Sequence, residues 1–93
     1  MERWLDTAQP VGHLTRPAVA EMVMEAIEYR DGTREWNTSE YVVMPNHVHW
    51  FGTLDRGALE DVMMDFKRWT GQRAIAILRL PGTRFWQREW FDH

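Results

Sequence analysis

The spacing of hydrophobic and polar residues predicts a helix and then a hairpin in the first half of the chain. Apolar residues follow Pro17 at helical spacing, glutamates occupy the other face, and Asp31-Gly32 ends the segment. Two further runs, at about 36–44 and 47–54, read as strands and are separated by Pro45-Asn46. Because proline and asparagine favour turns, we expect these two strands to pair as an antiparallel hairpin.

The second half of the chain returns to helical spacing and ends in an aromatic tail. Its apolar residues fall on one helical stripe until Pro81-Gly82, and Gly71 either breaks or weakens this helix. Residues 85–93 are rich in aromatic rings and are expected to form a short strand or an ordered arm. Residues 1–14 show little pattern. The order of elements predicts one α+β domain over residues 1–93, with helices packed on an antiparallel sheet.

Composition narrows the class of protein. The 93 residues are enough for one domain, and 44% of them are hydrophobic, which is typical of a globular protein. There is no cysteine, so disulfides and thiolate metal sites are excluded. No apolar run approaches the roughly 20 residues that span a bilayer, and the first 20 residues carry charges where a signal peptide would be apolar. We therefore expect a cytoplasmic protein.

Positive charge is concentrated in one part of a chain whose net charge is −3. Residues 66–88 contain six basic residues and no acidic one. Such a segment favours a polyanionic partner, although a solvated helix face has the same composition. Aromatic residues alternate with these cations, as in proteins that bind single-stranded nucleic acid. The expected phosphate contacts are Lys67, Arg68, Arg73 and Arg88, whereas Trp69 continues the apolar stripe and is expected in the core.

His47 and His49 are two residues apart on the second predicted strand. Side chains at positions i and i+2 of a strand point to the same face, so both imidazoles can reach one metal ion. Spacing alone leaves two interpretations open, a metal site or a packed pair without chemistry. A catalytic metal site usually has a third protein ligand. His13 and His93 are possible donors, but no local pattern connects either of them with the pair.

The residues around the histidines resemble a known family. The segment Tyr41-Val42-Val43-Met44-Pro45-Asn46-His47-Val48-His49-Trp50 is similar to the signature of the HUH endonucleases, and more closely to that of the REP-associated tyrosine transposases. Arg3-Trp4-Leu5-Asp6, Arg30-Asp31-Gly32 and Lys67-Arg68-Trp69-Thr70 resemble other stretches of that family. Residues 85–93 look like its segment of tryptophan, glutamine, arginine and aromatic residues. The resemblance covers nearly the whole chain in the right order.

This resemblance implies a fold and a reaction. The fold would be the ferredoxin-like sheet of HUH nucleases. His47 and His49 would bind a divalent ion, Mg²⁺ or Mn²⁺, and would serve catalysis through it. The substrate would be single-stranded, hairpin-forming DNA, which is cleaved and rejoined through a phosphotyrosine intermediate during DNA transposition.

The chain departs from the family pattern at both ends. The family's first strand and its tyrosine-bearing helix have no counterpart in the sequence, so we expect an incomplete domain. Tyr29 and Tyr41 are the only tyrosines, and neither stands where the family has its nucleophile. A homodimer could cover the open edge of a reduced sheet. Two alternatives to the enzyme are a non-catalytic remnant that binds single-stranded nucleic acid and a small structural domain.

Overall fold

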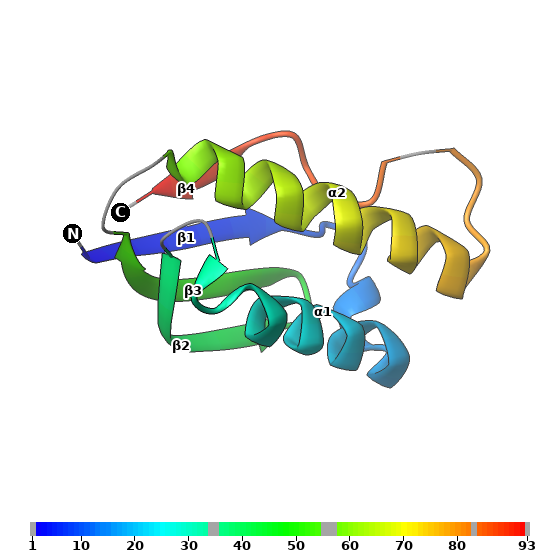
Figure 1. Cartoon of the computed structure of the whole chain (residues 1–93). Coiled ribbons are helices and arrows are strands. Elements are labelled where there is room, and N and C mark those ends of the chain that lie inside the picture. Colours follow the sequence, from blue (N-terminus) through cyan, green and yellow to red (C-terminus); the bar gives the residue numbers. More distant parts are fainter. Residues whose placement is uncertain (1, 34–35, 55–57, 83, 93) are drawn as a thin grey trace.

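The computed structural model describes residues 2–33, 36–54, 58–82 and 84–92. In chain order its elements are β1 (Glu2–Ala8), the short 3₁₀ helix η1 (His13–Thr15), α1 (Pro17–Arg30), β2 (Trp36–Met44), β3 (His47–Leu54), α2 (Leu59–Leu78) and β4 (Trp90–Asp92) (Figure 1). The expected α+β class, the hairpin and both helices are confirmed.

The strands form one antiparallel sheet in the order β2-β3-β1-β4. Strand β1 lies between β3 and β4, so the expectation of a sheet without a strand before the first helix is wrong. Polar residues hide this strand from pattern analysis. Within Glu2–Ala8, only Leu5 and Thr7 are buried, and the other side chains lie on the opposite face or at the edge.

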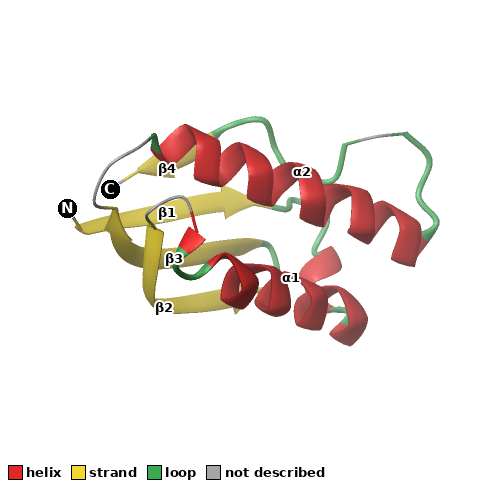
Figure 2. Cartoon of the chain, viewed as in Figure 1, coloured by secondary structure: helices red, strands yellow, loops and turns green. Residues whose placement is uncertain are grey.

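Both helices pack on the same face of the sheet (Figure 2). Residues on β3 alternate between buried and partly exposed, and Val48 and Trp50 point toward the helices. The rings of Trp50 and Phe66 lie 5.1 Å apart between centroids and connect the sheet to α2. His47, His49 and Phe51 therefore point away from the helices, because alternate residues of a strand face opposite sides.

The hairpin is fixed by two buried tryptophans. The indole N–H groups of Trp36 and Trp50 both donate to the hydroxyl oxygen of Thr38, at 3.0 and 2.9 Å. Gly52 lies against Trp36 so closely that a Cβ atom there would be 2.5 Å from the indole. This contact holds β2 and β3 in one register.

Helix α2 runs without a break through Gly71. A Cβ atom at Gly71 would meet Phe85 and Trp86 at ordinary van der Waals distances, 3.8 and 3.7 Å. The glycine thus lies where residues 84–89, here called the tail segment, cross α2. No helix in the described part of the chain is long and apolar enough to cross a bilayer.

The tail segment is held between α2 and β1. The indole N–H of Trp86 donates to the hydroxyl of buried Thr70 at 2.9 Å, and the backbone N–H of Gln87 donates to the carbonyl of Ala8 at 2.9 Å. Trp86 is buried and Trp90 is partly buried, as expected for so small a domain. The tail thereby places its arginines beside the central strand of the sheet.

Candidate metal centre and nucleic-acid interface

The histidine pair lies on the face of the sheet opposite the two helices, here called the open face. His47 and His49 project from β3 on the same side, and their Nε2 atoms are 2.9 Å apart. Their ring planes are inclined at 82°. His49 keeps 35% of its side-chain surface exposed, so the pair is not sealed in the core. The predicted convergence of the two imidazoles is therefore present in the structure.

Two oxygen atoms determine which ring nitrogens carry protons. The carboxylate of Asp6 on β1 contacts Nδ1 of His49, and the side-chain Oδ1 of Asn46 lies 2.8 Å from Nδ1 of His47. A hydrogen on each Nδ1 would satisfy these two acceptor oxygens. In the neutral rings, each Nε2 then has a lone pair, and the two lone pairs face each other. A cation between the two Nε2 atoms would be bound by both lone pairs.

The geometry of the pair fits a divalent ion. Ligands at neighbouring corners of an octahedron with bonds of about 2.1 Å are about 3 Å apart, which matches the Nε2 separation. Histidines that bind metals usually donate their other N–H to a carboxylate or an amide oxygen, as His47 and His49 do here. The donor set of two imidazoles suits Mn²⁺ better than the harder Mg²⁺.

Further protein ligands do not join this pair within the described residues. No group of three or more His, Asp or Glu side chains there could hold one ion. His13, one of the two possible donors, instead stacks on Phe85 at a centroid distance of 6.0 Å. His93 lies outside the described residues. Within the described residues, the two Nε2 atoms are thus the imidazole donors that come together at this point.

Aromatic side chains lie on the His49 side of the histidine pair on the open face. Trp4 and Phe51 are register partners on β1 and β3, and their ring centroids are 4.6 Å apart. The edge of Trp4 also meets His49 at 6.2 Å. Phe91 on β4 pairs with Asp6 in the sheet and is 59% exposed. This surface offers flat apolar rings next to a potential phosphate site.

Neither tyrosine of the chain lies on the open face. Tyr41 is the register partner of Trp50, so it points toward the helices. Its hydroxyl donates to Glu28 on α1 at 2.8 Å, and burial together with this carboxylate raises the pKa of Tyr41. A raised pKa opposes formation of the phenolate that a nucleophile requires. Tyr29 lies on α1 and is 78% exposed.

The four expected phosphate contacts fall into two places. Arg68 and Arg88 are exposed and line a groove between α2 and the tail segment, together with Arg84. Arg73 instead lies on the side of α2 that faces α1, with its guanidinium 4.8 Å from the centre of the Trp69 ring. Trp69 is partly buried against the core, as expected, and a second guanidinium, from Arg30, lies 5.3 Å from its centre.

Lys67 is engaged within the chain. Its ammonium donates to the backbone carbonyls of Gln87 and Arg88, the latter at 2.9 Å. Partial burial lowers the pKa of Lys67, and the nearby Glu89 opposes this shift. Two of its three N–H groups hold the tail segment on α2, and one is left for a phosphate.

Sequence reasoning missed Asp6 as part of the site. The residue is partly buried and separated from His49 by more than forty positions in the sequence. The available signal was the alternation of Trp4, Asp6 and Ala8, which places these residues on one face of a strand. That signal has meaning only once β1 is known to pair with β3.

Comparisons with known proteins find similar solved structures but no similar family model or curated sequence. No protein-family model matches the sequence, and no curated protein is similar enough to count as a relative. Among solved structures, the chain is similar to a "putative transposase" from Deinococcus radiodurans R1, with a TM-score of 0.80, 17% identity, and coverage of 100% of this chain and 77% of that one. It is also similar to a REP-associated tyrosine transposase bound to a REP hairpin, with a TM-score of 0.69, 18% identity, and coverage of 99% of this chain and 54% of that one.

These similarities define the class of fold. The four-stranded antiparallel sheet with two helices is the fold of transposase structures, as the sequence resemblance led us to expect. The chain spans about half the length of the hairpin-bound transposase.

Proposed function

We propose that this chain provides the metal-binding and DNA-positioning part of a transposase that cleaves and rejoins single-stranded DNA through a phosphotyrosine intermediate. The observation that carries the proposal is the histidine pair, in which His47 and His49 direct two Nε2 atoms to one point on the open face. The hairpin-bound structural neighbour supports a hairpin-forming DNA as the partner.

Each part of the site has a role in this proposal. A bound divalent ion would act as a Lewis acid on the scissile phosphate and stabilise its developing charge. Asp6 and Asn46 keep both Nδ1 atoms protonated, so both Nε2 atoms stay available as ligands. Trp4 and Phe51 shield one side of the histidine pair from water, and their rings are available to stack on bases. The exposed arginines of α2 and the tail segment hold the phosphate backbone.

Neither tyrosine of these 93 residues is placed to act as the nucleophile of the proposed reaction. In such a reaction a tyrosine oxygen attacks phosphorus and the 3′-oxygen leaves, which gives a 5′-phosphotyrosine and a free 3′-OH. Tyr41 points to the helix side and Tyr29 is on α1, so neither is placed for this attack. We therefore expect no covalent adduct when the chain alone is incubated with Mn²⁺ and a labelled hairpin oligonucleotide.

Manganese binding tests the proposal directly. Electron paramagnetic resonance of Mn²⁺ should show binding to the wild-type chain and no binding after His47→Ala and His49→Ala together. The matched control is His13→Ala, which removes an imidazole elsewhere and should leave Mn²⁺ binding unchanged. A folded wild-type chain that binds no Mn²⁺, or a double variant that still binds it, would contradict the proposal.

A second candidate function is favoured by the position of the tyrosines. A chain without a nucleophile on its open face could bind single-stranded DNA without cutting it. Fluorescence anisotropy with a hairpin oligonucleotide should show affinity that falls with salt and is largely retained in the double histidine variant, because the arginines lie elsewhere. A double histidine variant that no longer binds metal but still binds DNA would show that the histidines hold the ion and the arginines hold the DNA. Affinity that did not change with salt would contradict the phosphate contacts.

A further inference from the structure

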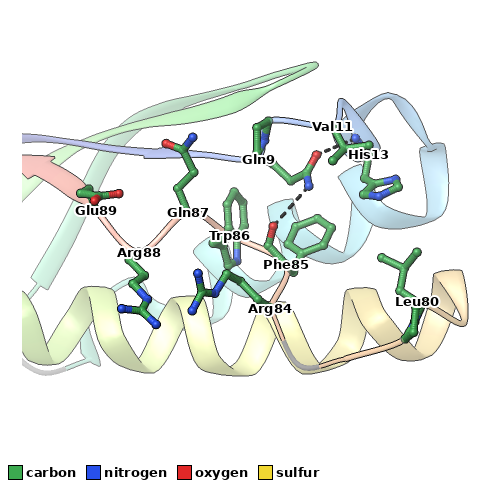
Figure 3. Close-up of a pocket in the computed structure, with 12 residues that line it drawn as sticks. Gln9, Val11, His13, Leu80, Arg84, Phe85, Trp86, Gln87, Arg88 and Glu89 are labelled. Carbon is green, nitrogen blue, oxygen red and sulfur yellow. Dashed lines mark hydrogen bonds between the residues drawn. The ribbon is translucent and has the colours of Figure 1, made fainter.

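A pocket of about 560 Å³ lies between the loop that follows β1, the end of α2 and the tail segment. Its volume falls within the range of about 300–1,000 Å³ that is typical of small-molecule sites. Apolar and polar side chains share its wall, and the charged ones, Arg84, Arg88 and Glu89, all belong to the tail segment. Figure 3 shows Val11, His13 and Leu80 grouped at one end with Phe85 beside them, and Arg84 and Arg88 following along the tail segment. We call this the tail pocket.

The wall of the tail pocket is held by one buried amide. Gln9 is 2% exposed, and its side-chain nitrogen donates to the carbonyl of Phe85 at 3.2 Å, while its side-chain oxygen accepts from the backbone N–H of His13 at 2.8 Å (Figure 3). These two hydrogen bonds connect the tail segment with the loop across the pocket. The pocket is therefore shaped before any ligand binds.

The same residue connects the tail pocket to the histidine pair. The backbone N–H of Gln9 donates to the carbonyl of Asn46 at 2.7 Å, and the side chain of Asn46 contacts His47. On the other side, Gln87 donates to Ala8, which is the register partner of His47. The pocket and the pair thus lie at the same end of the sheet, separated by only a few residues of connected backbone.

The charge around the tail pocket favours a nucleotide. Arg84 and Arg88 are exposed at its rim and belong to the segment that contains no acidic residue between positions 66 and 88. Glu89 is the only acidic residue among the described residues that line the pocket. Its carboxylate interacts electrostatically with the ammonium of Lys67, which partly offsets its negative charge. The His13 ring, nearly parallel to Phe85 at 21°, presents a flat surface for stacking.

We propose that the tail pocket binds one unpaired nucleobase of the DNA strand whose phosphate lies at the histidine pair. The base would enter between His13, Val11 and Leu80, and the phosphate beside it would meet Arg84 and Arg88. This inference rests on the proposed function, because it needs single-stranded DNA at the open face. It assigns base selection to residues of the loop and the tail rather than to the histidines.

An abasic scan tests the tail pocket. The probes are a hairpin oligonucleotide with a five-nucleotide unpaired extension and five copies in which one extension base at a time is removed. Fluorescence anisotropy with the wild-type chain should show that removal of one particular base weakens binding about tenfold, as expected for the loss of a stacked base. The other positions should change the dissociation constant much less.

A charge placed in the tail pocket should abolish the loss of affinity that follows removal of the critical base. Val11→Asp introduces a carboxylate at a side chain that is 72% exposed, so the fold should be preserved. In this variant, the intact DNA and the critical abasic DNA should bind equally. The control Tyr29→Asp adds the same charge at an exposed position on α1, outside the pocket, and should keep the tenfold difference.

The outcomes separate this proposal from the proposed function. If no extension base matters but salt-dependent binding of the hairpin persists, the tail pocket is not a base site and the proposed function stands. The same conclusion follows if Val11→Asp keeps the abasic effect, since the base then binds elsewhere. If the wild-type chain binds none of the probes at low salt, both proposals are wrong.

Discussion

Asp6 on β1 and His49 on β3 are direct register partners, and the carboxylate of Asp6 contacts Nδ1 of the imidazole. The contact crosses two antiparallel strands that are far apart in the sequence. It turns the ring so that its other nitrogen points toward His47. The orientation of the histidine pair therefore depends on a residue that is not itself a candidate ligand of the ion.

Removal of this carboxylate should weaken metal binding. We expect Asp6→Ala to lower the affinity for Mn²⁺ by about 10- to 100-fold, because a metal-binding histidine loses basicity and orientation without its acceptor. A Mn²⁺ titration of the folded variant measures the effect. Glu2→Ala is the matched control, since it removes the same charge from the same strand about 13 Å away along β1. Equal effects of both substitutions would mean that only net charge matters.

The close contact between Gly52 and Trp36 predicts a loss of stability. In Gly52→Ala the new methyl group would lie 2.5 Å from both the indole and the carbonyl oxygen of Asn37, so the hairpin would have to shift. We expect the free energy of unfolding to fall by about 1–3 kcal/mol. Gly71→Ala is a useful comparison, because its methyl group meets only ordinary contacts and favours the helix by up to about 1 kcal/mol. Urea unfolding of both variants should therefore give changes of opposite sign.

The shared acceptor of the two tryptophans can be tested at Thr38. Thr38→Val keeps the shape of the side chain and removes the oxygen that receives both indole N–H groups. We expect a loss of about 1–3 kcal/mol, because buried donors are left without a partner. Thr38→Ser keeps the oxygen and should lose less. Thermal or urea unfolding that ranks the two variants in the reverse order would contradict this role of the hydroxyl.

The raised pKa of Tyr41 predicts a decrease in stability at alkaline pH. Between the unfolded value of 10.0 and the higher pKa in the folded chain, the unfolded state releases a proton that the folded state keeps. This contribution to stability is fully present below pH 10 and is lost as the pH rises through that interval. Urea midpoints measured from pH 8 to 11 should decline less steeply above pH 10 in Tyr41→Phe than in the wild type. Identical slopes would mean that the phenol titrates normally.

The basic groove between α2 and the tail segment predicts how salt affects DNA binding. Arg68→Ala should reduce the slope of log affinity against log salt by about 0.7 to 0.9, the value for one lost phosphate contact. Arg73 lies on the other side of α2 against Trp69, so Arg73→Ala should change the slope less. Anisotropy titrations at several salt concentrations compare the two variants. A larger change for Arg73 would place the DNA between the helices instead.

Local patterns in the sequence were sufficient for the elements whose contacts are close in the chain. Pro45-Asn46 marks the turn, so the bounds of β2 and β3 follow from it. The same patterns failed at Gly71, because the packing of Phe85 and Trp86 on the glycine compensates for its low helix propensity. They also could not decide which face Tyr41 occupies, since a strand's register is a property of two segments.

The parts of the candidate site also differ in how far the sequence alone predicts them. His47 and His49 were predictable because alternation along one strand places them together. Asp6 and the tail pocket depend on pairings between β1, β3 and the tail segment, and such long-range pairings leave no periodic trace in the sequence.

The central position of β1 links folding to assembly of the site. This strand precedes both of its partners in the chain, β3 and β4 (Trp90–Asp92). A nascent chain must therefore keep residues 2–8 unpaired until the hairpin has emerged from the ribosome. Because pairing of distant segments is slow compared with helix formation, we expect Asp6 to reach His49 after the helices and the hairpin have formed.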